Sequence, residues 1–265
     1  MVQRAETSHD RESGIQSVRR AAALLRAIGN GAGELGVSEL GRKLNLHKST
    51  VSRLLATLER EGLLERPPGS EKYRLGYELL RLAGQAGEDR DLLADARPFL
   101  VELAERTRET ANLAVLDGEM VHNVAQVSGP HLVRIGNWVG RRTPPHCVAN
   151  GKALLAFQPE PDLRRLLAQT LERFTPRTVT SRPALRAELA RVRQQGFALA
   201  EGEIEDGLNA VAAPVRDGAG RVVAALSVSG PAYRLTRERL PELGAVTKDV
   251  SDRLSERLGR YRRAA

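Results

Sequence analysis

The stretch from Leu44 to Arg66, LNLHKSTVSRLLATLEREGLLER, constrains the fold more than any other part of the sequence. Its apolar residues recur at spacings of three and four, which places them on one face of a helix and leaves hydroxyls and cations on the other. The apolar face holds Val51, Leu54, Leu55 and Leu58, and the polar face holds Lys48, Ser49, Ser52, Arg53 and Arg60. A helix of about four turns that stops at Gly62 therefore has one side for a core and one for a partner.

The segments around this helix predict a familiar arrangement. The spacing of apolar residues indicates a helix over Ile15–Ile28, and a short second helix is expected to be capped by Ser38 and closed by Asn45. After the third helix, GLLERPPGSEKYRLG predicts a hairpin through its Pro-Pro-Gly-Ser turn. The order helix, helix, turn, helix, hairpin is that of a winged helix-turn-helix.

The polar face of the third helix suits the major groove of DNA. Short hydroxyls let the helix approach phosphates, and an arginine can bond bidentately to a guanine edge. A solvated surface helix with scattered charges is the alternative, but the tight turn before the helix and the basic hairpin after it favour DNA binding. The candidate contacts are Lys48, Ser49, Thr50, Ser52 and Arg53 on the helix and Lys72 and Arg74 on the hairpin.

Composition bounds the class of protein. The 265 residues exceed the roughly 100–200 of one domain, so two domains are expected. The formal charge of +8 is compatible with an anionic partner, but up to Arg90 the chain holds 15 Lys and Arg against 12 Asp and Glu, so this part carries only +3. Cys147 is the only cysteine, which excludes an intrachain disulfide. With a polar N-terminus and no long apolar run, a cytoplasmic protein without membrane contact is expected.

The remainder of the chain predicts a linker and a second domain. A helical pattern from Tyr77 to about Arg108 is interrupted by Gly84, Gly87 and Pro98 and is interpreted as a linker helix. ANLAVLDGEMVHNVAQV predicts a hairpin through its Asp-Gly turn, and LNAVAAPVRDGAGRVVAALSVSG predicts a second hairpin. Helices are expected at 151–157, 162–173, 184–195 and 236–258.

Antiparallel strands beside helices make this second domain α+β, so the fold class is mixed. The predicted division of the chain is a flexible tail (1–13), a winged helix-turn-helix domain (14–76), a linker helix region (77–108) and a second domain (109–265).

Several motifs, in one order, resemble a known family. GIQSVRRAAALLRAI, LGRKLNLHKSTVSRLLATLEREGLLER and KYRLGYELLRLA are followed by VGRRTPPHCVANGKALLAF, a run from RTVTSRPAL to NAVAAPVRD, and VVAALSVSGPAYRLT. From about residue 14 to residue 258 the chain resembles the isocitrate lyase regulator (IclR) family of bacterial transcription factors. The resemblance implies a GAF-like second domain that binds a small-molecule effector and forms homodimers or homotetramers. It also implies binding to a near-palindromic double-stranded operator, as repressor or activator.

The resemblance further implies an effector site. By motif position the contacts fall on Ala149, Asn150, Ala210, Ser227 and Ser229. The residues themselves support this region, because a strand over VVAALSVSG would place its larger side chains in the core and its small ones, ending in two serines, on the other face. A helix starting at ANGK would offer free N–H groups to an anion. A small organic acid or similar polar metabolite is therefore expected, although the serines could also pack an ordinary half-buried strand.

The chain departs from the family where the effector would be selected. Val148 and Asn150 stand where family members often have Thr and Ser, and Ala200 and Ala210 replace positions that elsewhere are polar or Cys. The effector is therefore not transferable from the family. Asn150 and Glu201 are the local polar candidates for a changed specificity.

Other chemistry fits the sequence less well. Cys147 beside His146, with His122 and His131 nearby, would allow a thiol nucleophile or a metal pair, but adjacent residues rarely bind one ion together. NGKA lacks the earlier glycine of a phosphate loop and has Ala153 in place of Ser or Thr. We expect no enzymatic activity, no cofactor and no metal. The alternatives are a thiol-dependent enzyme on the second domain or a structural protein that binds DNA without sequence preference.

Overall fold

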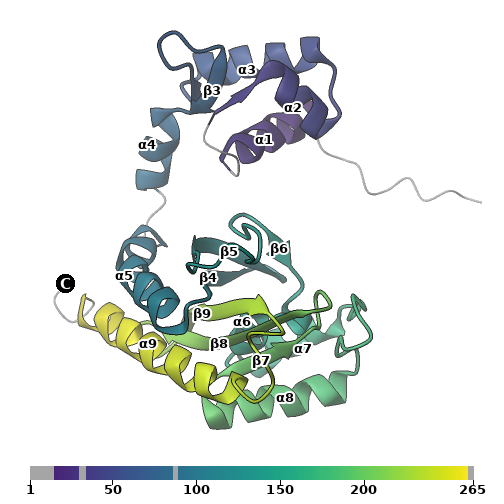
Figure 1. The fold of residues 1–265 in the computed structure, drawn as a ribbon, viewed down its shortest axis with the longest axis vertical. Helices are drawn as coiled ribbons and strands as arrows, with labels where there is room; N and C mark the ends of the chain where they lie inside the picture. The colour runs from purple at the N-terminus through teal and green to yellow at the C-terminus, as the bar shows by residue number, and fades with distance from the viewer. Residues whose placement is uncertain (1–14, 30–33, 86–88, 262–265) are drawn as a thin grey trace, which may run out of the picture. The chain divides into compact units, whose positions relative to one another are not determined.

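A computed structural model describes residues 15–29, 34–85 and 89–261 (Figure 1). The tail predicted for residues 1–13 and the predicted linker break at Gly87 lie outside the described residues. The chain divides into two compact units, residues 1–87 and residues 88–265. This division falls inside the region predicted as a linker, over 77–108.

The first unit is a winged helix-turn-helix, as predicted. Its elements are α1 (Gln16–Gly29), β1 (Leu35–Gly36), α2 (Val37–Leu44), α3 (Lys48–Arg60), β2 (Leu64–Glu65), β3 (Lys72–Leu75) and α4 (Tyr77–Gln85). The described strands form a small antiparallel sheet in the order β1-β3-β2, of which β1 was not predicted. The predicted apolar face of α3 is in the core: Val51 and Leu55 pack with Leu24, Ile28 and Leu40.

The two ends of α2 test the capping rules applied to the sequence. The prediction that Ser38 caps α2 is wrong, because the helix already begins at Val37 and Gly36 is its N-cap. The backbone N–H of Gly36 donates to Glu39 Oε2 at 2.8 Å, so a carboxylate in the first turn replaces the expected hydroxyl. At the other end Asn45 is left-handed (φ 51°), which confirms that it closes the helix.

The second unit is α+β. Its elements are α5 (Asp89–Thr107), β4 (Thr110–Asp117), β5 (Met120–Val127), β6 (Arg142–Thr143), the 3₁₀ turn η1 (Pro145–Cys147), α6 (Ala149–Leu155), α7 (Glu160–Ala168), α8 (Arg182–Gln195), β7 (Ala198–Glu201), β8 (Leu208–Arg216), β9 (Val222–Pro231) and α9 (Leu240–Tyr261). The described strands form a six-stranded antiparallel sheet in the order β6-β5-β4-β9-β8-β7. Both predicted hairpins are present, β4–β5 and β8–β9.

Helices cover both faces of this sheet (Figure 1). α5 and α9 lie against one face, where Leu100, Leu113, Leu226 and Val250 belong to one cluster. α6 lies on the other face and packs with α7 and α8 around a second cluster that includes Ala225. One face of β9 is core, as expected, with Leu226 and Val228 in the first cluster, and the other face lies under α6.

Several helix boundaries differ from the sequence predictions, most of all in α7 and α9. α7 ends at Ala168 rather than residue 173, and α9 begins at Leu240 rather than residue 236. Pro98 lies inside α5 and does not end it. The short edge strands β6 and β7 were not predicted, because two and four residues are too few for a recognisable alternation.

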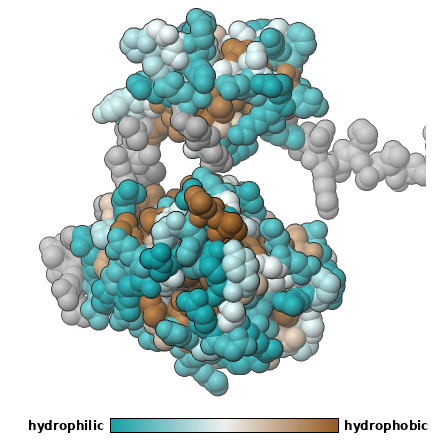
Figure 2. Space-filling model, viewed as in Figure 1, coloured by the Kyte–Doolittle hydropathy of each residue, from teal (hydrophilic) through white to brown (hydrophobic). Residues whose placement is uncertain are grey.

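The surface is mainly hydrophilic, with limited apolar patches, on the side drawn in Figure 2. No helix in the described part of the chain is long and apolar enough to cross a bilayer.

Candidate functional site

The start of α3 carries most of the predicted DNA contacts on one exposed surface. Lys48, Ser49, Ser52 and Arg53 are exposed, and Thr50 is half-buried. The helix is capped by His47, whose Nδ1 accepts the N–H of Ser49 at 3.4 Å and lies 2.8 Å from its hydroxyl. The remaining free N–H groups of this first turn face a region where Lys48 adds positive charge, which suits a phosphate.

The cations near α3 differ in how far they are already neutralised. Lys48, Arg53 and Lys72 make no ion pair with any described residue, so their charges are available to a polyanion. Arg74 is different, because its Nε donates to Glu65 Oε1 at 2.6 Å. The structure therefore favours Lys72 over Arg74 as the contact from the hairpin.

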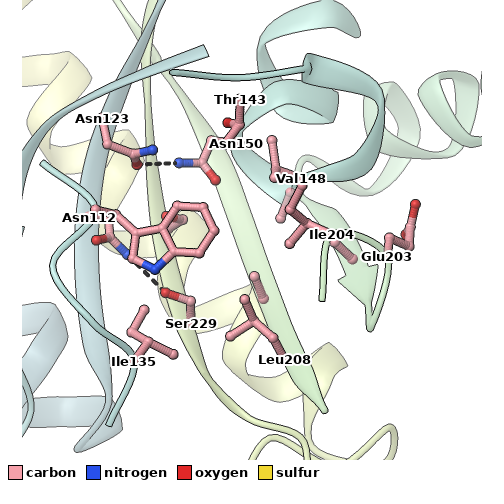
Figure 3. A pocket seen from close by; sticks show the side chains of 15 residues that line it. Asn112, Asn123, Ile135, Thr143, Val148, Asn150, Glu203, Ile204, Leu208 and Ser229 are labelled. Atoms are coloured by element: carbon pink, nitrogen blue, oxygen red, sulfur yellow. Dashed lines mark hydrogen bonds between the residues drawn. The ribbon is translucent and has the colours of Figure 1, made fainter. Parts of the chain in front are cut away.

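The second unit encloses a cavity between the sheet and the start of α6 (Figure 3). The space inside it is about 470 Å³ when the open mouth is included. The lining consists of Asn112, Asn123, Ile135, Trp138, Thr143, Val148, Ala149, Asn150, Ala200, Glu203, Ile204, Leu208, Ala210, Ser227 and Ser229.

Strand register explains why the sheet is hollow at this place. Asn112 on β4 lies opposite Ser227 on β9, and Ser229 lies opposite Ala210 on β8. Two residues before Ser227, on the same face of β9, lies Ala225, which belongs to the core cluster under α6. Small side chains on neighbouring strands thus leave space under α6, and the loop that carries Trp138 closes it.

Two hydrogen bonds join the amides of the lining. Asn112 Nδ2 donates to Ser229 Oγ at 2.9 Å, and Asn150 Nδ2 donates to Asn123 Oδ1 at 3.2 Å (Figure 3). These bonds fix the amides of β4, β5 and α6 in one orientation, so the cavity presents a defined set of polar atoms.

Unpartnered polar atoms gather at this cavity. Among the described residues, four buried side-chain atoms have no hydrogen-bond partner, namely Asn112 Oδ1, Thr143 Oγ1, Glu203 Oε2 and Asn209 Oδ1. The first three belong to residues of the lining. Each unmet buried group costs about 1–3 kcal/mol, a cost that a ligand or water in the cavity would remove.

A buried ion cluster lies behind the lining. Lys152 on α6 is 1% exposed, and its Nζ lies 2.5 Å from Glu203 Oε1 and 2.7 Å from Glu188 Oε2. Burial raises the pKa of Glu203 above its ordinary value, and the neighbouring Lys152 opposes that rise. The cluster joins α6, α8 and the β7–β8 loop at the back of the cavity, and no sequence signal had singled it out.

The structure brings together most of the predicted effector residues. Ala149, Asn150, Ala210, Ser227 and Ser229 all line the cavity, and so do the divergent Val148 and Ala200. Glu201 does not, because it follows Ala200 on β7 and therefore faces the opposite side of the sheet, where it lies 3.8 Å from Arg237. The lining residues that sequence reasoning missed include Asn112, Asn123, Thr143, Trp138 and Glu203.

The Cys147 thiol is poorly placed for catalysis. It is fully buried, its Sγ donates to the carbonyl of Pro144 at 3.4 Å, and burial raises its pKa to about 12. The neighbouring His146 uses Nε2 to bond the carbonyl of Glu172 at 2.9 Å. Within the ranges that the structure describes, no three His, Cys, Asp or Glu residues are grouped to hold a metal ion. This geometry does not favour the thiol-enzyme alternative.

Family models of known proteins match both units of the chain. The model of the IclR helix-turn-helix domain matches residues 17–68, and that of the bacterial transcriptional regulator IclR C-terminal domain matches residues 85–256. The chain belongs to the IclR family. Both the resemblance noted in the sequence and the predicted fold class are confirmed.

Individual IclR-family members are similar over nearly their whole length. The HTH-type transcriptional regulator Rv1719 of Mycobacterium tuberculosis is 39% identical, over 93% of this chain and 94% of that protein. The crystal structure of the Thermotoga maritima IclR has a TM-score of 0.73 and 30% identity, over 92% of this chain and 98% of that one. An IclR homologue from Microbacterium hydrocarbonoxydans, solved in complex with 4-hydroxybenzoate, has a TM-score of 0.73 and 28% identity, over 94% and 100% of the two chains.

The protein is thus a DNA-binding transcriptional regulator of the IclR family, with a helix-turn-helix domain and an effector-binding C-terminal domain. This confirms the function predicted from the sequence. Regulators of this family do not fit the alternative of a structural protein that binds DNA without preference.

Proposed function

We propose that this regulator binds a small organic acid in the cavity under α6, and that occupancy changes its affinity for an operator contacted by α3. The observation that carries the proposal is the concentration of buried, unpartnered polar atoms at one cavity, on Asn112, Thr143 and Glu203. A fold keeps such groups where a bound molecule satisfies them, since otherwise each one lowers stability.

The chemistry of the lining supports a small ligand that is part polar and part apolar. Amides and hydroxyls lie beside Ile135, Trp138 and Leu208, which suits a short carbon skeleton with polar ends. The Microbacterium homologue was solved with 4-hydroxybenzoate, an acid of this kind, which supports the same ligand class here. Asn150 and Ala210 stand at positions where this chain departs from the family. We therefore expect its acid to differ from the effectors of other family members.

On the DNA side, the proposal assigns phosphate contacts to Lys48, Ser49, Thr50 and Lys72 and base recognition to Ser52 and Arg53. The exposed, unpaired cations support this assignment. Arg74 is assigned a smaller contribution because Glu65 already neutralises it. Since the target is DNA, we place the protein in the cytoplasm.

We also propose a homodimer or homotetramer on a near-palindromic operator, because two-fold symmetric sites are bound by symmetric regulators. Coupling between the effector and the operator is expected at about 1–3 kcal/mol, which is the usual range for allostery. We assign no catalytic role, since the Cys147 thiol stays protonated at neutral pH.

The test is fluorescence anisotropy on the DNA upstream of the gene and on a scrambled duplex, with a panel of small acids added. Preferential binding that shifts about fivefold or more with an acid supports the proposal. Ser227→Ala should weaken the response to the acid. Ser251→Ala is the matched control, since Ser251 is equally buried but bonds Pro214 on the other face of the sheet. An unchanged response in Ser227→Ala together with Asn150→Ala would contradict the proposed site.

A further inference from the structure

The loop between β5 and β6 closes the cavity, and part of it is weakly held. This cavity loop (residues 128–141) carries Trp138 of the lining. Residues 129–135 of the loop make one hydrogen bond within the described part of the chain: Arg234 Nη2 donates to the carbonyl of Val133 at 3.0 Å. Arg234 is therefore the main polar restraint on this part of the loop.

Arg234 follows the end of β9 and is itself fixed by a buried carboxylate. Its Nε donates to Glu109 Oε1 at 2.5 Å, and its Nη2 donates to Glu109 Oε2 at 2.9 Å. The side chain of Glu109 is only 4% exposed, and a fork of two bonds fixes the orientation of a guanidinium as well as its charge. Gly230 leaves room for the carboxylate, because a Cβ there would lie 2.6 Å from Glu109 Oε2.

Glu109 belongs to the junction between α5 and β4. It lies between Thr107, where α5 ends, and Thr110, where β4 begins. The junction turns sharply at Arg108, whose left-handed backbone (φ 59°) is uncommon for a residue other than glycine. The cavity loop also touches it, since a Cβ on Gly129 would lie 2.5 Å from the carbonyl oxygen of Arg108. The loop and the end of α5 are thus in contact through backbone and through the Arg234–Glu109 pair.

The position of α5 in the chain gives this contact a consequence for regulation. α5 is the first element of the second unit, and in the chain it follows α4 of the DNA-binding unit. The covalent path from the cavity to that unit therefore passes through α5. The strands beneath the cavity are paired in the sheet and packed against helices, so among the cavity walls the loop has the most freedom to respond to a ligand.

We infer that Arg234 is a positioning residue that couples the cavity loop to the end of α5 through Glu109. A ligand packed against Trp138 restrains the loop, the loop restrains Arg234 through the carbonyl of Val133, and Arg234 restrains the α5–β4 junction. The inference rests on the proposed function, because it names the residues through which an occupied cavity acts on operator binding. Neither Glu109 nor Arg234 lines the cavity, so a variant of either removes no contact with the ligand.

The fluorescence of Trp138, the only tryptophan, tests the hold on the loop without any ligand. Arg234→Lys keeps a positive charge beside Glu109 but lacks the planar fork that reaches both carboxylate oxygens and Val133 at once. Acrylamide quenching of Trp138 in the full-length protein should rise about twofold in this variant, because the loop opens more often. Glu109→Gln should raise it too, and the double variant should add little, as expected of residues that act together.

Arg253→Gln is the matched control. Arg253 on α9 pairs with Glu102 on α5, so its loss breaks an ion pair of the same helix that does not include the cavity loop. Quenching of Trp138 should stay at the wild-type value in this variant. An equal rise in Arg253→Gln and Arg234→Lys would mean a general loosening of the unit and would overturn the inference.

The coupling between acid and operator is the readout that a merely structural role would not move. Anisotropy on the upstream DNA is measured with and without 4-hydroxybenzoate, benzoate, butyrate or succinate. The wild type should shift about fivefold or more with the most effective of these acids, and Arg234→Lys should shift less than about twofold. Loss of folded protein alone would keep the ratio of the two affinities unchanged. Calorimetry of the acid with and without operator should give the same factor, because coupling is reciprocal.

The outcomes separate the inference from the function on which it rests. Unchanged quenching of Trp138 in Arg234→Lys, or a full shift by the acid in that variant, would overturn the inference and leave the effector function in place. If none of the four acids shifts operator binding by the wild type, the proposed function is overturned and the inference with it. Glu109→Gln provides the same two readouts if Arg234→Lys does not fold.

Discussion

The two functional regions of this regulator keep their polar groups in opposite surroundings. On α3 the hydroxyls and cations are exposed, and Lys48 and Arg53 form no ion pair with a described residue. In the cavity of the second unit, Asn112 and Glu203 are more than nine-tenths buried, and each has an atom without a partner. In the absence of DNA, water forms hydrogen bonds with the polar groups of α3. The unpartnered atoms of the cavity form such bonds only when water or a ligand enters it.

This difference determines what each region contributes to regulation. An exposed cation costs little to maintain and gains its free energy from counterions that DNA releases, so its contribution falls with salt. A buried unpartnered group costs about 1–3 kcal/mol in the empty protein, and a ligand that satisfies it recovers that amount. The hydrogen bonds that a ligand forms in the cavity therefore supply free energy that can shift the equilibrium between two conformations of the regulator.

The largest expected effect is on the buried ion cluster. Lys152→Met removes the cation that lies between Glu203 and Glu188. Glu188 keeps Arg191 at 3.7 Å, but Glu203 is left buried without a charged partner. We expect a loss of about 3–5 kcal/mol in the unfolding free energy of the second unit. Urea unfolding followed by the fluorescence of Trp138, the only tryptophan, reports on this unit.

Lys248→Met is the control for this loss. Lys248 pairs with Asp252 on the exposed face of α9 at 2.5 Å, where an ion pair contributes less than about 1 kcal/mol. Equal effects of the two lysine variants would remove the contrast between buried and exposed charges.

The second prediction concerns base recognition by α3. Arg53→Ala should reduce the preference for operator over scrambled DNA by about 1–3 kcal/mol, because a bidentate contact to a guanine edge is lost. Arg74→Ala should change the preference less, since Glu65 already pairs with that arginine. Anisotropy across a salt series measures both, and Lys48→Ala should lower the salt slope by about 1 with the preference kept. A preference that survives in Arg53→Ala would assign base recognition to another residue.

The third prediction separates function from stability in the cavity. Asn112→Leu removes an unpartnered acceptor and also the bond from Nδ2 to Ser229 Oγ at 2.9 Å. These two effects oppose each other, so the stability of the empty protein should change by less than about 1 kcal/mol, while effector binding weakens about tenfold. Asn209→Leu is the counterpart on the other face of the sheet. Its Oδ1 is also unpartnered in the described structure and its Nδ2 bonds the carbonyl of Leu235 at 2.9 Å, so stability should change to a similar extent, whereas effector binding should not change. Thermal unfolding and calorimetry together give both readouts.

The same contrast explains what could be read from the sequence. The residues of α3 lie within one helix, and a spacing of three or four places them on one face without further information. The winged helix-turn-helix and both hairpins of the second unit were predicted for the same reason, since their signals are local. Asn45 as a helix end also followed from local chemistry, because Asn tolerates a left-handed backbone.

The cavity could be predicted only in part. Ser227 and Ser229 were found because two small polar residues alternate within one strand. Asn112 comes from a strand more than a hundred residues earlier, and only the pairing of β4 with β9 brings it opposite Ser227. Glu201 was chosen as a local polar candidate, but it lies on β7 and faces away from the cavity. Glu203 lies beyond the end of β7, where the alternation of a strand no longer predicts direction.

The smallest expected effect concerns how α2 begins, where the sequence rule chose the wrong residue. Ser38→Ala should leave hydrogen exchange of the α2 amides unchanged, because Ser38 is exposed and lies inside the helix. Glu39→Ala should speed it about threefold at pH 7, because the carboxylate bonds the N–H of Gly36 and stands in the positive first turn.

The bond to Gly36 lowers the pKa of Glu39 from its ordinary value of 4.5, with a smaller contribution from the nearby Lys72. A carboxylate whose pKa is lowered on folding contributes its stability above the ordinary value and loses it as the pH falls through the lowered value. The difference between wild type and Glu39→Ala should therefore be complete above pH 4.5 and shrink as the pH is lowered below it. A difference that persists in strong acid would mean that the packing of the Glu39 side chain, and not its charge, holds the start of α2.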